Sequence, residues 1–142
     1  MKFGHALEER ERNGPTRYRT LYISYKRLKK ILKEGKAGAR VTASRLFLAE
    51  LEREIGRINA LVLDEQREIW ALQREAVRLR ESLMTPRTRV AHEGALWRRT
   101  SELRAFVETA YETVYKAVKK HDKQTGLELM DQASTWRWRF TR

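Results

Sequence analysis

Residues 51–83 read LEREIGRINALVLDEQREIWALQREAVRLRESL, and this stretch decides the fold class. Apolar residues recur there with heptad spacing, and Glu65 is the one polar interruption. The apolar positions are Leu51, Ile55, Ile58, Val62, Ile69, Leu72, Ala76, Leu79 and Leu83. This spacing predicts one long amphipathic helix. Thr42 or Ser44 can cap its start and Thr85-Pro86 ends it, so we expect a helix over residues 42–84.

A second apolar stripe follows the turn at Pro86. It consists of Leu96, Leu103, Val107, Ala110, Val114, Ala117 and His121. The stripe predicts a helix over residues 89–124 that stops before Gly126. A short loop makes two long helices antiparallel neighbours. The balanced outer charges of the first helix would suit a coiled coil, but we interpret the pair as part of a helical bundle.

The first 36 residues predict a helical hairpin. Phe3 and Leu7 indicate a short first helix. From Thr16 to Lys36 the large apolar residues are spaced by steps of three and four, which is a helical stripe. They are Tyr18, Leu21, Tyr25, Leu28 and Leu32. Residues 125–142 are expected to form a C-terminal helix or tail, in which Trp136 and Trp138 alternate with arginines. The fold class is therefore all-α: an N-terminal hairpin packed on a bundle with two long antiparallel helices.

Length and composition limit the remaining choices. A chain of 142 residues with 41% hydrophobic residues suits one domain over residues 1–142. The absence of cysteine excludes disulfides and thiolate metal sites. No apolar run approaches the length of a membrane span, and the start, MKFGHALEERER, lacks the apolar segment of a signal peptide. We therefore expect a cytoplasmic or nuclear location, or the cytosolic face of a membrane-bound parent protein.

The positive charge is concentrated rather than spread. The chain has a formal net charge of +12, and residues 16–36 carry eight bases against one acid. Residues 40–83 carry eight of each and balance. Such clustering indicates an anionic partner, namely nucleic acid, a lipid headgroup or a phosphorylated metabolite. A solvated basic surface is the alternative.

Two groups of basic residues have helical spacing. Lys116, Lys119, Lys120 and Lys123 share one face of the later helix, and Tyr22, Lys26, Lys29, Lys30 and Lys33 share one face of the earlier helix. Like charges one turn apart destabilise a helix, and neither face carries compensating acids. Lysine supplies compact charges with three donors each, which suits a small, densely phosphorylated ligand.

Three segments carry a resemblance to a known family. MKFG at the N-terminus with YISYKRLKKILK at 22–33 resembles the opening of the SPX domain family. LFLAELEREIGRIN at 46–59 is similar to that family's second block, and KAVKKHDK at 116–123 resembles its third. The resemblance implies a small helical domain that senses phosphate status by binding inositol polyphosphates, above all inositol pyrophosphates. It also implies a protein partner or a fused effector domain, and no cofactor or metal.

The resemblance also implies roles for individual residues. Tyr22, Lys26 and Lys120 match the family's phosphate-binding cluster, and we expect them at the partly desolvated edge of the core. Lys116, Lys119 and Lys123 match its lysine surface cluster, and we expect them to be more exposed. Lys2, Lys29 and Lys30 match further basic positions near the same pocket.

An enzyme and a nucleic-acid-binding module are the two other function classes. An enzyme is not expected, because no catalytic motif is present and no nucleophile has an evident base. His121 lies on an apolar stripe, which predicts a packed core histidine. A basic helical module that binds nucleic acid or another polyanion is the alternative function, with the Trp-Arg tail as its site. Nucleic acid is disfavoured because no nucleic-acid fold signature accompanies the charge.

Overall fold

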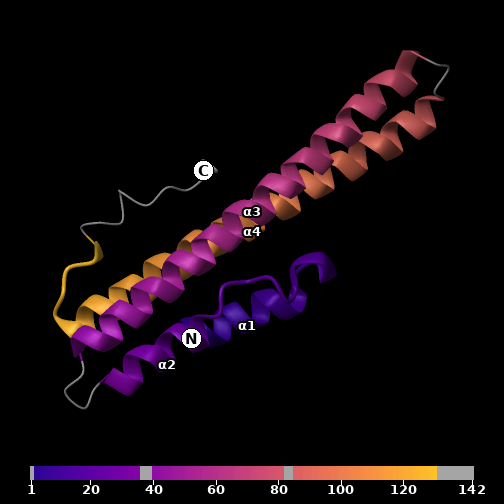
Figure 1. Ribbon diagram of the computed structural model, residues 1–142. Helices are drawn as coiled ribbons and strands as arrows, with labels where there is room; N and C mark the ends of the chain where they lie inside the picture. Colours follow the sequence, from indigo (N-terminus) through magenta and orange to yellow (C-terminus); the bar gives the residue numbers. More distant parts are fainter. Residues whose placement is uncertain (1, 36–39, 82–84, 131–142) are drawn as a thin grey trace.

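The computed structural model describes residues 2–35, 40–81 and 85–130, and these form helices without any strand (Figure 1). The elements in chain order are α1 (Phe3–Asn13), the short 3-10 helix η1 (Thr16–Tyr18), α2 (Tyr25–Glu34), α3 (Arg40–Glu81) and α4 (Pro86–Thr125). The predicted all-α class is confirmed. Most of the expected C-terminal helix or tail, including Trp136 and Trp138, lies outside the described residues.

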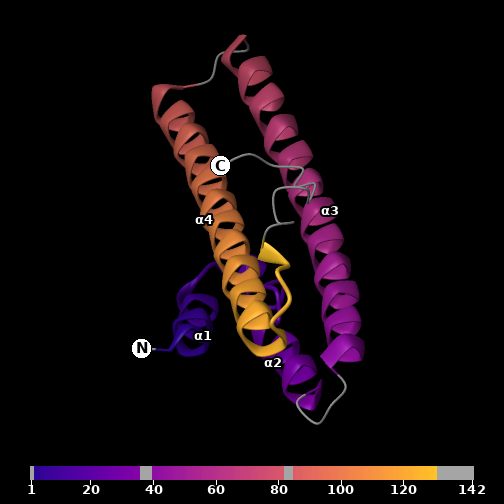
Figure 2. The same cartoon turned by 90° about the vertical axis from the view of Figure 1, so that its left-hand side faces the viewer.

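α3 and α4 are the two predicted long helices, and they run antiparallel along each other (Figures 1 and 2). The side chain of Thr85 accepts a hydrogen bond from the Thr88 N–H at 3.2 Å, and Pro86 occupies the first turn. α4 therefore starts earlier than residue 89, because its cap and its proline lie upstream of the apolar stripe. The helix ends at Thr125, and the following residue, Gly126, has a φ of 74°, in the left-handed region that glycine tolerates best.

The N-terminal hairpin is present, but its second arm is shorter than predicted. The continuous helix expected from Thr16 to Lys36 is wrong: η1 ends at Tyr18, and α2 begins only at Tyr25. The side chain of Ser24 caps α2 by accepting from the Arg27 N–H at 3.3 Å, which favours a helix start at this position. The apolar stripe predicts the wrong helix start because Tyr18 and Tyr25 are both buried in the core, although Tyr18 belongs to η1 and Tyr25 to α2.

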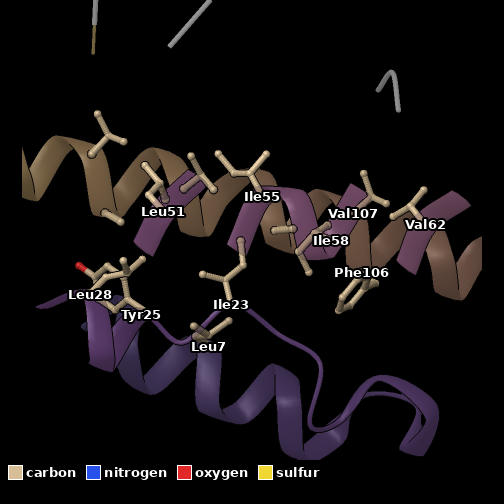
Figure 3. Packing of buried hydrophobic residues seen from close by; sticks show 14 of the residues in the cluster. Leu7, Ile23, Tyr25, Leu28, Leu51, Ile55, Ile58, Val62, Phe106 and Val107 are labelled. Atoms are coloured by element: carbon tan, nitrogen blue, oxygen red, sulfur yellow. The ribbon is translucent and has the colours of Figure 1, made fainter. Parts of the chain in front are cut away.

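The core forms where the N-terminal segment meets α3 and α4 (Figure 3). Leu7 and Ile23 of the N-terminal segment and Ile55 and Ile58 of α3 belong to this core, and all four side chains are at least nine-tenths buried. Phe106 of α4 stacks on Tyr18 with ring centroids 4.7 Å apart. The hydrophobic contact between the hairpin and the long helices therefore sets the position of α1 and α2.

Glu65, the polar interruption of the heptad pattern, has partners from two other elements. Its carboxylate accepts from the Tyr18 hydroxyl at 3.0 Å and from Arg99 of α4 at 3.2 Å. Burial raises the pKa of Tyr18, and the hydrogen bond to Glu65 raises it further. Although Glu65 interrupts the apolar stripe, its carboxylate therefore has hydrogen-bond partners.

The two halves of the long helices differ in their surroundings. α1 and α2 pack beside the N-terminal half of α3 and the C-terminal half of α4, while the other halves extend beyond them (Figures 1 and 2). Among the described helices, none combines the length and apolar character needed to cross a membrane.

Gly35 provides a test of the packing between α2 and α3. A Cβ atom at Gly35 would lie 2.2 Å from the Cβ of Ala43, so the two helices would have to separate. We expect Gly35→Ala to lower the free energy of unfolding by about 1–3 kcal/mol in urea denaturation. The matched control is Gly56→Ala on α3, because a Cβ there meets nothing within 4 Å. That change should raise the free energy by about 0.5–1 kcal/mol, and an equal loss in both variants would contradict the packing described.

Candidate functional site

Lysines from three parts of the chain meet at the start of α1. The structure brings together four of the predicted basic residues, which we call the lysine cluster: Lys2 before α1, Lys26 and Lys29 on α2, and Lys116 on α4. The other predicted lysines extend from this cluster along α2 and α4. They are Lys30, Lys119 and Lys123, which are exposed, and Lys120, which is half-buried one turn beyond Lys116.

An aromatic pair lies at the centre of the lysine cluster. The rings of Phe3 and Tyr25 meet edge to face, with centroids 5.0 Å apart. The Nζ of Lys29 lies 4.9 Å from the centre of the Tyr25 ring, and the Nζ of Lys116 lies 6.0 Å from the centre of the Phe3 ring. Attraction to the ring faces holds both ammonium groups in place despite their like charge. Two cations from different helices are therefore positioned before any anion binds.

A pocket of about 320 Å³ opens between α1 and the start of α2. Its lining consists of Lys2, Gly4, His5, Leu7, Glu8, Glu11, Ser24, Tyr25, Lys26 and Lys29. Gly4 lies next to Lys29, since a Cβ there would make an ordinary van der Waals contact with its Nζ at 3.5 Å. The first turn of α1, all of it described, holds no acidic residue, and its cap residue Lys2 makes no side-chain hydrogen bond to it. The helix end thus adds its positive dipole to the lysine charges.

Two carboxylates also line this pocket, and the sequence interpretation did not include them. Glu8 and Glu11 both line it, one turn apart on α1. Burial raises the pKa of Glu11, and the neighbouring charge of Glu8 raises it further. These carboxylates repel an anion, so the part of the pocket next to Lys2 and Lys29 is the part that favours negative charge.

Tyr22 does not lie on the helical face to which the sequence assigned it. It precedes α2, and its ring packs edge-on against Phe106 with centroids 5.0 Å apart. Its hydroxyl points toward Gly14, where a Cβ would come within 3.0 Å of it. Burial raises the pKa of Tyr22. Tyr22 is absent from the lining of the pocket, and its contact with phosphate stays a prediction.

The expected order of exposure between Lys26 and Lys116 is reversed. Lys26 is exposed, because α2 begins at Tyr25 and this tyrosine takes the inward position one residue earlier. Lys116 is half-buried, because Phe3 of α1 lies near its ammonium group. Lys119 and Lys123 are exposed and Lys120 is half-buried, as expected.

A second polar cluster closes the C-terminal end of α4. His121 is fully buried, as predicted, and stacks on Phe47 with centroids 4.9 Å apart. Its Nδ1 lies 2.9 Å from a carboxylate oxygen of Asp122, and its Nε2 lies 2.7 Å from the hydroxyl of Ser44. The backbone N–H groups of Leu129 and Met130 each donate to Asp122 at 2.9 Å.

This arrangement corrects the expectation that no nucleophile has a nearby base. Ser44 and His121 are 77 positions apart, so sequence spacing does not reveal their contact. Both carboxylate oxygens of Asp122 accept hydrogen bonds from the backbone that follows α4, and the Phe47 ring stacks on the histidine ring. The cluster therefore attaches the segment that follows α4 to the first turns of α3.

Comparison with known proteins finds SPX domain-containing proteins that are similar to this chain. SPX domain-containing protein 5 of Oryza sativa subsp. indica is 28% identical over 134 residues, covering 89% of this chain and 53% of the relative. SPX domain-containing protein 6 of subsp. japonica is 28% identical over 133 residues, covering 89% and 55%. SPX domain-containing protein 3 of subsp. indica is 32% identical over 80 residues, covering 53% and 29%. No family model matches the chain.

These matches confirm the resemblance to the SPX domain family that the three sequence segments indicate. The chain spans about half the length of the two relatives that match most of it.

Proposed function

We propose that this chain is a sensor domain that binds inositol polyphosphates, and inositol pyrophosphates above all. The observation that carries the proposal is the placement of Lys29 of α2 and Lys116 of α4 over the two rings of one aromatic pair. The relationship to SPX domain-containing proteins supports the ligand class, because the family resemblance implies this kind of ligand. The adjoining pocket supports a ligand that presents phosphate groups to the start of α1.

The binding mechanism is electrostatic capture by side chains of separate helices. Phosphates bridge α1, α2 and α4, each accepting charge-assisted hydrogen bonds from lysine. Each such bond contributes about 1.5–3 kcal/mol at best, and less for exposed lysines such as Lys26 because solvent and salt screen them. Several together reach micromolar affinity, about 8 kcal/mol. Lys119 and Lys123 contribute longer-range attraction, which salt weakens.

Ligand binding also links parts of the fold that otherwise meet through side-chain packing. Lys2 precedes α1, Lys29 belongs to α2 and Lys116 to α4, so one anion holds the N-terminal hairpin against the long helices. This ordered surface is what a partner protein or a fused effector domain reads out. The state of the sensor therefore depends on whether the anion is bound.

Thermal melting tests the proposal on the intact chain. A ligand that binds only the folded state raises the melting temperature by mass action. We expect inositol hexakisphosphate to raise it clearly more than inorganic phosphate at the same total phosphate concentration. Equal shifts for the two would mean general screening of the +12 charge and would contradict a dedicated site.

A further inference from the structure

One half of the α3–α4 pair extends beyond the N-terminal hairpin (Figures 1 and 2). It carries five of the nine large hydrophobic side chains that are exposed among the described residues. Trp70 and Val77 of α3 are each 55% exposed, and Val90 and Trp97 of α4 are 68% and 73% exposed. Tryptophan is rarely left this exposed. Two exposed tryptophans and two exposed valines in one region indicate a contact surface.

Of these four residues, Val77 lines a groove between α3 and α4. A hollow of about 300 Å³ lies between the two helices, and its lining includes Ala76, Val77 and Leu96. At 100° per residue, Trp70 projects about 20° from Val77, and Val90 about 20° from Trp97. Trp97 in turn lies about 40° from Glu93, another lining residue. Trp70 thus projects to the same side of α3 as the lining residue Val77, and Val90 and Trp97 project to the side of α4 that carries Glu93, so the four apolar side chains flank the groove.

The groove has basic edges. Arg80 and Arg89 line it, and Arg80 forms an ion pair with Glu93 across it. Arg89 has no acidic partner within the described part of the chain. The same holds for Arg74, which lies one turn after Trp70 on α3. An apolar floor with unpaired guanidinium groups at its margin complements a surface that is apolar in the middle and acidic at its edges.

We propose that this groove docks an acidic amphipathic helix of a partner protein. A third helix laid between α3 and α4 would cover Trp70 and Trp97 with its apolar face, and its flanking carboxylates would meet Arg74 and Arg89. A second copy of this chain fits less well, because it brings the same basic edges and another +12 charge. A bilayer fits less well because the surface is concave. The groove is separate from the lysine cluster, so this inference does not depend on the ligand proposed above.

Binding of model peptides to the full chain tests the inference. The probe is an acidic peptide of about three heptads, with leucine on one face and glutamate elsewhere. Its controls are a lysine version and a version with scrambled leucines. The Lys29→Ala/Lys116→Ala chain serves as background, so that adsorption to the lysine cluster is removed. Only the acidic amphipathic peptide should bind, and Trp97→Ser, Trp70→Ser and Arg89→Glu should each weaken it by about tenfold.

Because Trp97 and Trp70 are exposed, these variants should melt like the parent chain. The inference is overturned by peptide binding that ignores both tryptophan substitutions or that does not distinguish the scrambled peptide. It is equally overturned by a concentration-dependent dimer in sedimentation that Trp97→Ser abolishes, which would make a second copy the occupant. Binding of anionic vesicles that Trp97→Ser abolishes, without peptide binding, would make the face a membrane surface.

Discussion

Replacing both Lys29 and Lys116 with alanine is expected to weaken the binding of inositol hexakisphosphate by about a hundredfold. Each lysine supplies a charge-assisted contact from a different helix, and a tenfold loss for each corresponds to about 1.4 kcal/mol. The two ammonium groups already lie beside the Phe3–Tyr25 pair, so little ordering is needed when the anion binds. Calorimetric titration measures the effect.

The matched control for this pair is Arg87→Ala with Arg98→Ala. These exposed arginines lie on the far half of α4, and their loss lowers the net charge by the same amount. The control should change affinity by less than about threefold at physiological salt, because screening removes most of the attraction over such distances. Equal losses in the two double variants would show that the ligand responds to the overall charge and not to the lysine cluster.

Replacing Phe106 with alanine is expected to lower the free energy of unfolding by about 3–5 kcal/mol. Phe106 is 1% exposed and packs against both Tyr18 and Tyr22, so it joins the N-terminal segment to α4. Its removal leaves a cavity at this joint. Urea denaturation measures the change.

The control for the Phe106 variant is Trp97→Ala, because that side chain is 73% exposed. It should change the free energy of unfolding by no more than about 0.5 kcal/mol. A loss below about 1 kcal/mol for Phe106→Ala would contradict the packing of Tyr18 and Tyr22 on α4.

The long helices could be predicted from sequence because their burial follows a single period. Leu51, Ile58 and Val62 of α3 and Val114 of α4 all fall on the expected stripes and are buried. The helix start at Tyr25 was not predicted. The helical spacing of apolar residues begins already at Tyr18, but the backbone between Tyr18 and Tyr25 is not an α-helix. The serine at position 24, two residues before Lys26, was the available capping signal.

The candidate site could be predicted only in part, because it is made of residues from several helices. Helical spacing groups lysines along one helix, but it does not show which residues of other helices meet them. Phe3 and Gly4 lie next to Lys116 and Lys29, and these contacts become recognisable only once the helices are packed. The same holds for Glu11 in the pocket wall, and for Ser44 beside His121.

The most direct test of the central claim is a map of backbone amide chemical shifts on titration of the full chain with inositol hexakisphosphate. The largest changes are expected at Phe3 and Gly4 at the start of α1, at Tyr25, and around Lys116 of α4. They should saturate together, as one binding event requires. Changes that are largest at Trp136 and Trp138, or that spread evenly over all basic segments, would contradict a ligand held by the lysine cluster.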